Sequence, residues 1–158
     1  MGEIIFRGKN KNTGQWVYGD LIHKSGKDYI GYWVKDDDSP GGDGYIECEV
    51  VSETIGQFIG EYDINANRVF KGDIVKVKRI IHTDCSREEI DRVEKYIGEI
   101  VWYQFGWHMA EKIKNGIRFH TLWLWNVKDD EKEADTDFME VIGNRWENQE
   151  LRQIPELE

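Results

Sequence analysis

The feature that most constrains this fold is a two-residue alternation of apolar and polar side chains. In residues 45–50, Ile46, Cys48 and Val50 alternate with glutamates, and residues 73–78 repeat the pattern with valines and lysines. Such alternation puts apolar side chains on one face of a β-strand and polar ones on the other. Comparable patterns predict further strands at residues 3–7, 15–23, 28–34, 98–105, 119–127 and 138–142.

Turn-forming residues separate these predicted strands. Asn12-Thr13-Gly14 lies between the first two, Ser25-Gly26-Lys27 lies at hairpin distance between the next two, and Asn115-Gly116 precedes the run at 119–127. That run is apolar on both faces, which predicts a central strand. Gly72-Asp73 predicts a tight turn that leads into a strand, as in SH3-like barrels, with residues 98–102 as the partner strand.

One segment carries a helical signal. Ser86 and Glu89 have the spacing of a capping box, and Ile90, Val93 and Ile97 recur at helical intervals. We therefore expect a short helix near 87–97, inserted between two strands. The fold class predicted is mainly β: an antiparallel, partly open barrel or folded sheet with SH3-like elements and this one helix.

Size and charge narrow the class of protein. The 158 residues fit a single domain, 1–158, and the formal net charge is −10. Phosphate contacts need clustered Lys and Arg, so direct binding of nucleic acid is disfavoured. No apolar run approaches the ~20 residues of a spanning helix, and Cys48 and Cys85 form no C-x-x-C unit. We expect a cytoplasmic protein.

Motifs for chemistry are weak. An Asp-rich loop from Asp36 matches part of a calcium-binding loop, but Pro40 replaces a ligand. His82 and Cys85 lack the two further ligands that zinc requires, and no nucleophile or phosphate-binding signature is present. The sequence therefore nominates no catalytic, cofactor-binding or metal-binding residue, and no cofactor.

Five ordered elements carry a family resemblance, and they lie at 6–8, 15–21, 53–60, 63–77 and 140–148. They read FRG, QWVYGDL, ETIGQFIG, DINANRVFKGDIVKV and EVIGNRWEN, and together they resemble the YopX family of phage and prophage proteins. The resemblance implies a mainly β fold and a bacteriophage context but no activity. Ala66 stands where the family commonly has Gly, so we expect the left-handed conformation to pass to Asn65 or Asn67. Gln149 stands where Pro is common, after Asn148 as the expected cap of a terminal helical turn.

Three functions remain open. The first is a non-enzymatic module that binds an unknown protein partner or assembles with itself through surplus aromatic residues. The interface candidates are Trp33, Trp107, Trp125 and Trp146. The second is an acidic DNA mimic that inhibits a host nucleic-acid-binding protein, suggested by the acidic stretches 36–38 and 129–137.

The third open function is an enzyme with an unrecognised site. The polar residues to inspect for it are those of the family elements, Asp73, Asn144 and Glu147. Turn and cap formation is the competing interpretation of these residues.

Overall fold

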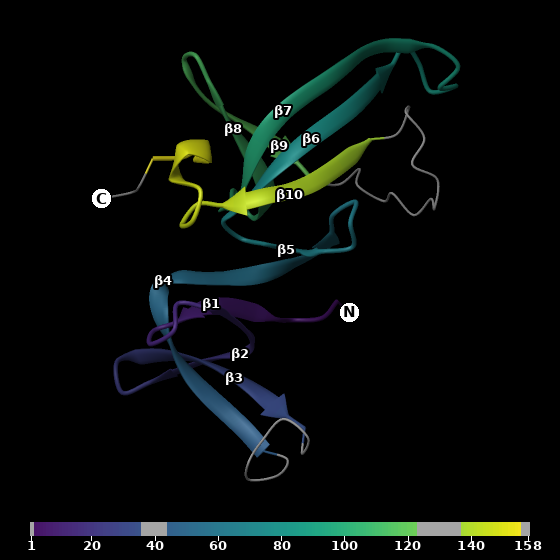
Figure 1. Ribbon diagram of the computed structural model, residues 1–158. Coiled ribbons are helices and arrows are strands. Elements are labelled where there is room, and N and C mark those ends of the chain that lie inside the picture. The colour runs from purple at the N-terminus through teal and green to yellow at the C-terminus, as the bar shows by residue number, and fades with distance from the viewer. Residues whose placement is uncertain (1, 36–43, 123–136, 156–158) are drawn as a thin grey trace. The chain divides into compact units, whose positions relative to one another are not determined.

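A computed structural model describes residues 2–35, 44–122 and 137–155 (Figure 1). The chain divides into two compact units, Met1–Gly60 and Glu61–Glu158. The described elements are antiparallel strands and one short 3-10 helix, which confirms the prediction of a mainly β fold. The prediction of a single domain stays a prediction.

The first unit is built from four strands: β1 (Phe6–Asn10), β2 (Trp16–Lys24), β3 (Lys27–Val34) and β4 (Gly44–Tyr62). Each pairs antiparallel with the next, and β4 returns to pair with β1, so the pairings form a ring. The alternating pattern turns Ile30, Val50 and Phe58 inward, where they form the buried core. The ring confirms the expected partly open barrel.

Both predicted turns of the first unit are present. Between β1 and β2, the side-chain oxygen of Asn10 accepts hydrogen bonds from the backbone N–H of Asn12 and Thr13. Between β2 and β3, Ser25 and Gly26 form a two-residue loop, with φ of 53° and 71°. Positive φ at both positions matches the type I′ turn that suits the twist of a hairpin.

The second unit contains six strands and the 3-10 helix. They are β5 (Arg68–Phe70), β6 (Asp73–His82), β7 (Ile90–Tyr103), β8 (Gly106–Ile113), β9 (Gly116–Thr121), β10 (Phe138–Asn144) and η2 (Gln149–Leu151). The described sheet has the order β10-β6-β7-β8-β9. The predicted pairing of 98–102 with the strand after Gly72 is confirmed, since Ile74 lies opposite Glu99.

Strand β7 changes partner near its middle, and this change positions the hairpin described below. Residues from Ile90 to Glu99 pair with β6, whereas those from Glu99 to Tyr103 pair with β8. The core beneath is formed by residues such as Val75, Val77, Ile100 and Met109. The end of β7 and the start of β8 therefore extend beyond β6 as a two-stranded hairpin.

The helix expected near 87–97 is wrong, because Ile90–Tyr103 is strand β7. The helical spacing of Ile90 and Val93 would place both on one buried face, yet both are largely exposed. Nine residues of β6 pair with this segment, and that ladder outweighs the local signal. Ser86 does not cap a helix; its hydroxyl donates to Asp84 and accepts from the N–H of Glu88.

Among the described residues, the run at 119–127 does not take the central position expected for it. Strand β9 covers Gly116–Thr121 and ends the order of the described sheet, with β8 as its neighbour. Residues from 123 lie outside the described part. The Asn115-Gly116 signal does mark a hairpin, whose two loop residues are Lys114 and Asn115. Within the described residues, no helix is long and apolar enough to cross a membrane.

Candidate protein-binding site

The polar residues of the family elements lie at one end of the β6–β10 pair in the second unit. Asp73 lies opposite Asn144 in the β6–β10 ladder and is almost fully buried, and its carboxylate accepts the N–H of Phe70 at 2.8 Å. The Asn144 side-chain oxygen accepts the N–H of Trp146 and Glu147 at 3.1 and 3.0 Å. Its amide donates to the Glu147 carboxylate at 2.9 Å. These contacts hold two turns and the strands that they follow.

A fourth polar residue, Asp63, holds the turn after β4 and also reaches β10. One carboxylate oxygen accepts the N–H of Asn65 and Asn67, and the other accepts the N–H of Val141 at 3.0 Å. The left-handed residue of this turn is Ala66 itself, with φ of 62°, so the expectation for Asn65 or Asn67 is wrong. The hydrogen bonds to Asp63 offset the cost of placing an alanine there.

Glu99 is a fully buried carboxylate at the base of the β7–β8 hairpin. One oxygen accepts the N–H of Gln153 and Ile154 at 3.1 and 3.3 Å, and the other lies 3.4 Å from Arg145. Gln153 also accepts the N–H of Lys112 at 2.9 Å. Glu99 thus ties residues 153–154 to the hairpin base. Its sequence signal was a lone acid inside an apolar strand.

The end of β10 shows a further difference from expectation. The side-chain oxygen of Asn148 makes no cap to η2 and instead accepts the N–H of Asn144 at 3.1 Å. This contact closes the same turn that Glu147 closes. The polar positions shared with the family are therefore engaged with backbone and with each other.

No metal site emerges from the part of the chain that the structure describes. There, no group of three or more His, Cys, Asp or Glu side chains is arranged to hold a metal ion. The acidic stretch 36–38 and nearly all of 129–137 lie outside the described residues.

The four tryptophans predicted as interface residues have different surroundings. Trp33 in β3 is 76% exposed, whereas Trp107 and Trp146 are half-buried. The Trp146 ring covers Gly72, where a Cβ would lie 2.4 Å from the ring. Gly72 has a φ of 88°, so both this contact and the turn require glycine. Trp125 lies outside the described residues.

An exposed aromatic cluster lies on the β7–β8 hairpin, and the sequence analysis had named only Trp107 of it as an interface candidate. We call Trp102–Trp107 the aromatic hairpin. Ile100 and Met109 are opposite each other and fully buried. One step along the same face, Trp102 and Trp107 are opposite each other, with their rings edge to face at 5.1 Å. Trp102 is 57% exposed, and Phe105 at the tip is 97% exposed. An apolar face thus continues from the core into solvent.

The tip of the aromatic hairpin has an unfavourable backbone. Gln104 and Phe105 form the two-residue loop between Tyr103 and Gly106, with φ of 40° and 70°. Among the described residues, this is the only place where two consecutive residues other than glycine have positive φ. Such turns favour Asn-Gly, and each residue forced into this region costs about 1–3 kcal/mol.

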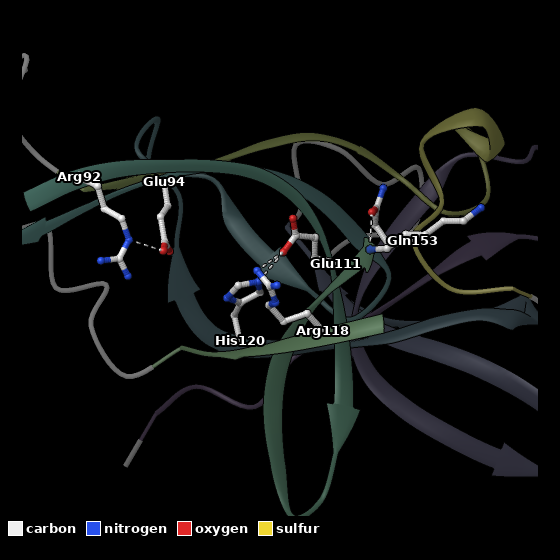
Figure 2. A network of polar contacts seen from close by, with 7 residues as sticks. Arg92, Glu94, Glu111, Arg118, His120 and Gln153 are labelled. Carbon is white, nitrogen blue, oxygen red and sulfur yellow. Dashed lines mark hydrogen bonds and ion pairs between the residues drawn. The ribbon is translucent and has the colours of Figure 1, made fainter. Parts of the chain in front are cut away.

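The strands behind the tip are braced by ring stacking. Tyr103 stacks on Phe119 of β9 with centroids 3.8 Å apart, and His120 stacks on Tyr96 at 4.0 Å. His120 also bonds to Glu111 at 2.8 Å, and Figure 2 shows Glu111, Arg118 and His120 pointing toward one another. Burial raises the pKa of Tyr96 well above its usual range. The hairpin therefore stands on a packed three-stranded support.

Comparison with known proteins identifies the family of this chain. The model of the family described as "YopX protein" matches residues 5–153, so the chain belongs to the YopX family. One similar solved structure is the crystal structure of protein EF1440 from Enterococcus faecalis. It is 18% identical, with a TM-score of 0.42, and the match covers 96% of this chain and 99% of that one. No curated protein matches significantly.

Proposed function

We propose that this YopX-family protein is a protein-binding module and that the aromatic hairpin is its contact element. The observation that carries the proposal is Phe105: a phenylalanine 97% exposed, in a turn position that disfavours it. Neither the exposure of Phe105 nor its unfavourable turn position stabilises the isolated chain. Burying this ring against a partner would return roughly 1.5–3 kcal/mol.

The expected partner is another protein with an apolar pocket. A projecting phenylalanine with Trp102 behind it has the composition of a binding hot spot, which is enriched in aromatic residues and surrounded by less critical contacts. The brace by Tyr103 and Phe119 lowers the entropy lost when the hairpin is fixed in a complex. The phage setting that the resemblance to the family implies supports a partner in a bacterial cell. The alternative is that the hairpin contacts a second copy of this chain.

The two other functions receive less support. On the β3–β4 sheet, Glu47 pairs with Lys24, and Glu49 pairs with Lys11 and Lys27, so those carboxylates do not present an uncompensated phosphate-like array. For an enzyme, the polar set of Asp73, Asn144 and Glu147 is engaged in turn contacts rather than around a shared reaction centre.

The test compares two neighbouring substitutions in the tagged full chain, expressed in its bacterial host with the prophage induced. Phe105→Asn removes the ring and places a residue that tolerates positive φ. Gln104→Asn relieves the adjacent position in the same way and keeps the ring. Proteins that co-purify are identified by mass spectrometry.

We expect a stoichiometric protein to co-purify with the parent and with Gln104→Asn, and to fall at least about tenfold with Phe105→Asn, as for a hot-spot residue. Equal recovery with both variants would contradict the role of the hairpin. Recovery of a DNA-binding protein that DNA competes off would favour mimicry. Recovery of this chain alone would make the module self-assembling.

A further inference from the structure

A second cluster of aromatic and acidic side chains lies on the β2–β3–β4 sheet of the first unit. Trp33 and Tyr45 are opposite each other on β3 and β4, with ring centroids 5.3 Å apart and planes inclined at 59°. Trp33 is 76% exposed. On β2, the exposed carboxylate of Asp20 accepts a hydrogen bond from the Tyr45 hydroxyl at 3.1 Å. We call Asp20, Trp33 and Tyr45 the aromatic corner.

The backbone is adapted to hold this arrangement. Asp20 and Glu47 lie on either side of Gly31 in the sheet, and the Tyr45 ring passes directly over that glycine. A Cβ at position 31 would lie 2.0 Å from the Tyr45 hydroxyl oxygen, so only glycine leaves room for the ring. The hydroxyl is thereby directed to Asp20, and the Trp33 ring is left facing solvent.

The charges of this sheet point to a cationic ligand. Glu47 and Glu49 already pair with lysines. Asp20 instead accepts a hydrogen bond from a neutral hydroxyl, and no lysine or arginine among the described residues forms an ion pair with it. Two effects raise the pKa of Tyr45: first desolvation of its hydroxyl, and then the hydrogen bond to the Asp20 carboxylate. The hydroxyl therefore stays protonated and acts as a donor.

We propose that the aromatic corner binds the guanidinium group of an arginine side chain on a protein partner. The planar cation stacks on the exposed face of Trp33, and its N–H groups donate to Asp20. Arginine fits better than lysine because its flat, weakly hydrated group satisfies an aromatic face and a carboxylate at once. The site lies in the other unit from the aromatic hairpin and does not depend on the proposed function of that hairpin.

The test is a titration of the 15N-labelled full chain followed by 1H–15N correlation spectra. The probe is the capped tripeptide Gly-Arg-Gly, and its matched control replaces arginine with citrulline, which has the same shape and no charge. We expect saturable shifts at the Trp33 indole N–H and the Tyr45 amide with arginine. Citrulline should bind at least about fivefold more weakly, because it lacks the cation that both groups attract.

Three variants decide which residues are responsible. Asp20→Asn keeps an acceptor for the Tyr45 hydroxyl and removes the charge, and Trp33→Leu removes the aromatic face; each should weaken arginine binding by about fivefold or more. Trp102→Leu, an exposed tryptophan of the other unit, should leave it unchanged. Equal affinity for citrulline, unchanged binding by Asp20→Asn, or no saturable shift at Trp33 would overturn the proposal.

Discussion

Two hairpins of this protein have the same turn backbone, but the residues that form the two turns are of very different types. The β2–β3 hairpin turns through Ser25 and Gly26, and the β7–β8 hairpin turns through Gln104 and Phe105, all four with positive φ. In the first, a small polar residue and a glycine adopt this backbone at low cost. In the second, the same backbone is imposed on a long side chain and an aromatic ring, and the ring is left in solvent.

The comparison distinguishes turn residues that are explained by the stability of the fold from turn residues that are not. Turn residues in most hairpins are those that the backbone favours, so an unfavourable pair with an exposed ring indicates another requirement. Strain alone is not sufficient evidence: Ala66 also has positive φ, but four hydrogen bonds to Asp63 support its turn. The aromatic hairpin has strain and exposure together, and for that reason we propose it, and not the Asp63 turn, as the binding element.

The largest expected effect lies at the base of the aromatic hairpin rather than at its tip. Glu99→Ala removes a buried carboxylate and leaves the N–H groups of Gln153 and Ile154 and the charge of Arg145 without it. We expect the free energy of unfolding to fall by about 3 kcal/mol, measured by urea denaturation. A loss below about 1 kcal/mol would show that contacts other than those of Glu99 stabilise this hairpin.

A substitution at Gly26 gives the β2–β3 hairpin a backbone strain like that of the β7–β8 hairpin. Gly26→Val places a β-branched residue at a φ of 71° and should destabilise the protein by about 2 kcal/mol. Gly26→Asn is the matched control, since asparagine tolerates this conformation, and should cost less than about 1 kcal/mol. Thermal unfolding followed by circular dichroism measures both. Equal effects would mean that φ does not limit this turn.

The third prediction is the reverse exchange. Changing Gln104→Asn and Phe105→Gly together gives the tip the sequence that its backbone favours, and the free energy of unfolding should rise by about 1–2 kcal/mol. The same double variant should lose the binding partner. A variant that is more stable and still binds would break the link between the unfavourable turn and function.

The smallest effect concerns pH. A hydrogen bond from Ser52 and then the contact with His23 lower the pKa of Asp28, which lies close to the turn of the β2–β3 hairpin. Its ionised form therefore stabilises the fold above the unfolded pKa of 3.8, and this contribution is lost as pH falls through the lower folded value.

The shift of the Gly26 amide signal, followed from pH 6 downward, should move in that acid range in the parent. It should lose this step in Asp28→Asn, which has no group to titrate at that position. A step that survives the substitution would show that another group is responsible.

The sequence predicted what depends on local chemistry. The alternation around Val75 and Val77, the turn at Ser25-Gly26 and the turn at Gly72-Asp73 are all present, because each follows from the residues at the position itself. The interface role of Trp33 remains a prediction, and its exposure is consistent with it.

The rest depended on contacts distant in sequence. The helical spacing near Ile90 was overridden by the ladder with β6. The run through residue 105 hid a turn, because Gln104 and Phe105 carry no turn signal. One sign was available: the pairs Trp102 and Trp107, and Ile100 and Met109, are symmetric about that two-residue centre, a pattern that indicates a hairpin even where the turn residues do not.

Photo-crosslinking from matched positions of the two hairpins shows directly whether the aromatic hairpin contacts a protein. A benzophenone amino acid is introduced as Gln104→p-benzoylphenylalanine or as Ser25→p-benzoylphenylalanine, the first turn position in each hairpin. The first substitution leaves Phe105 in place. After irradiation in the bacterial host, we predict a defined crosslink to a protein from position 104 and none from position 25. Equal crosslinking from both positions, or none from 104, would contradict the account.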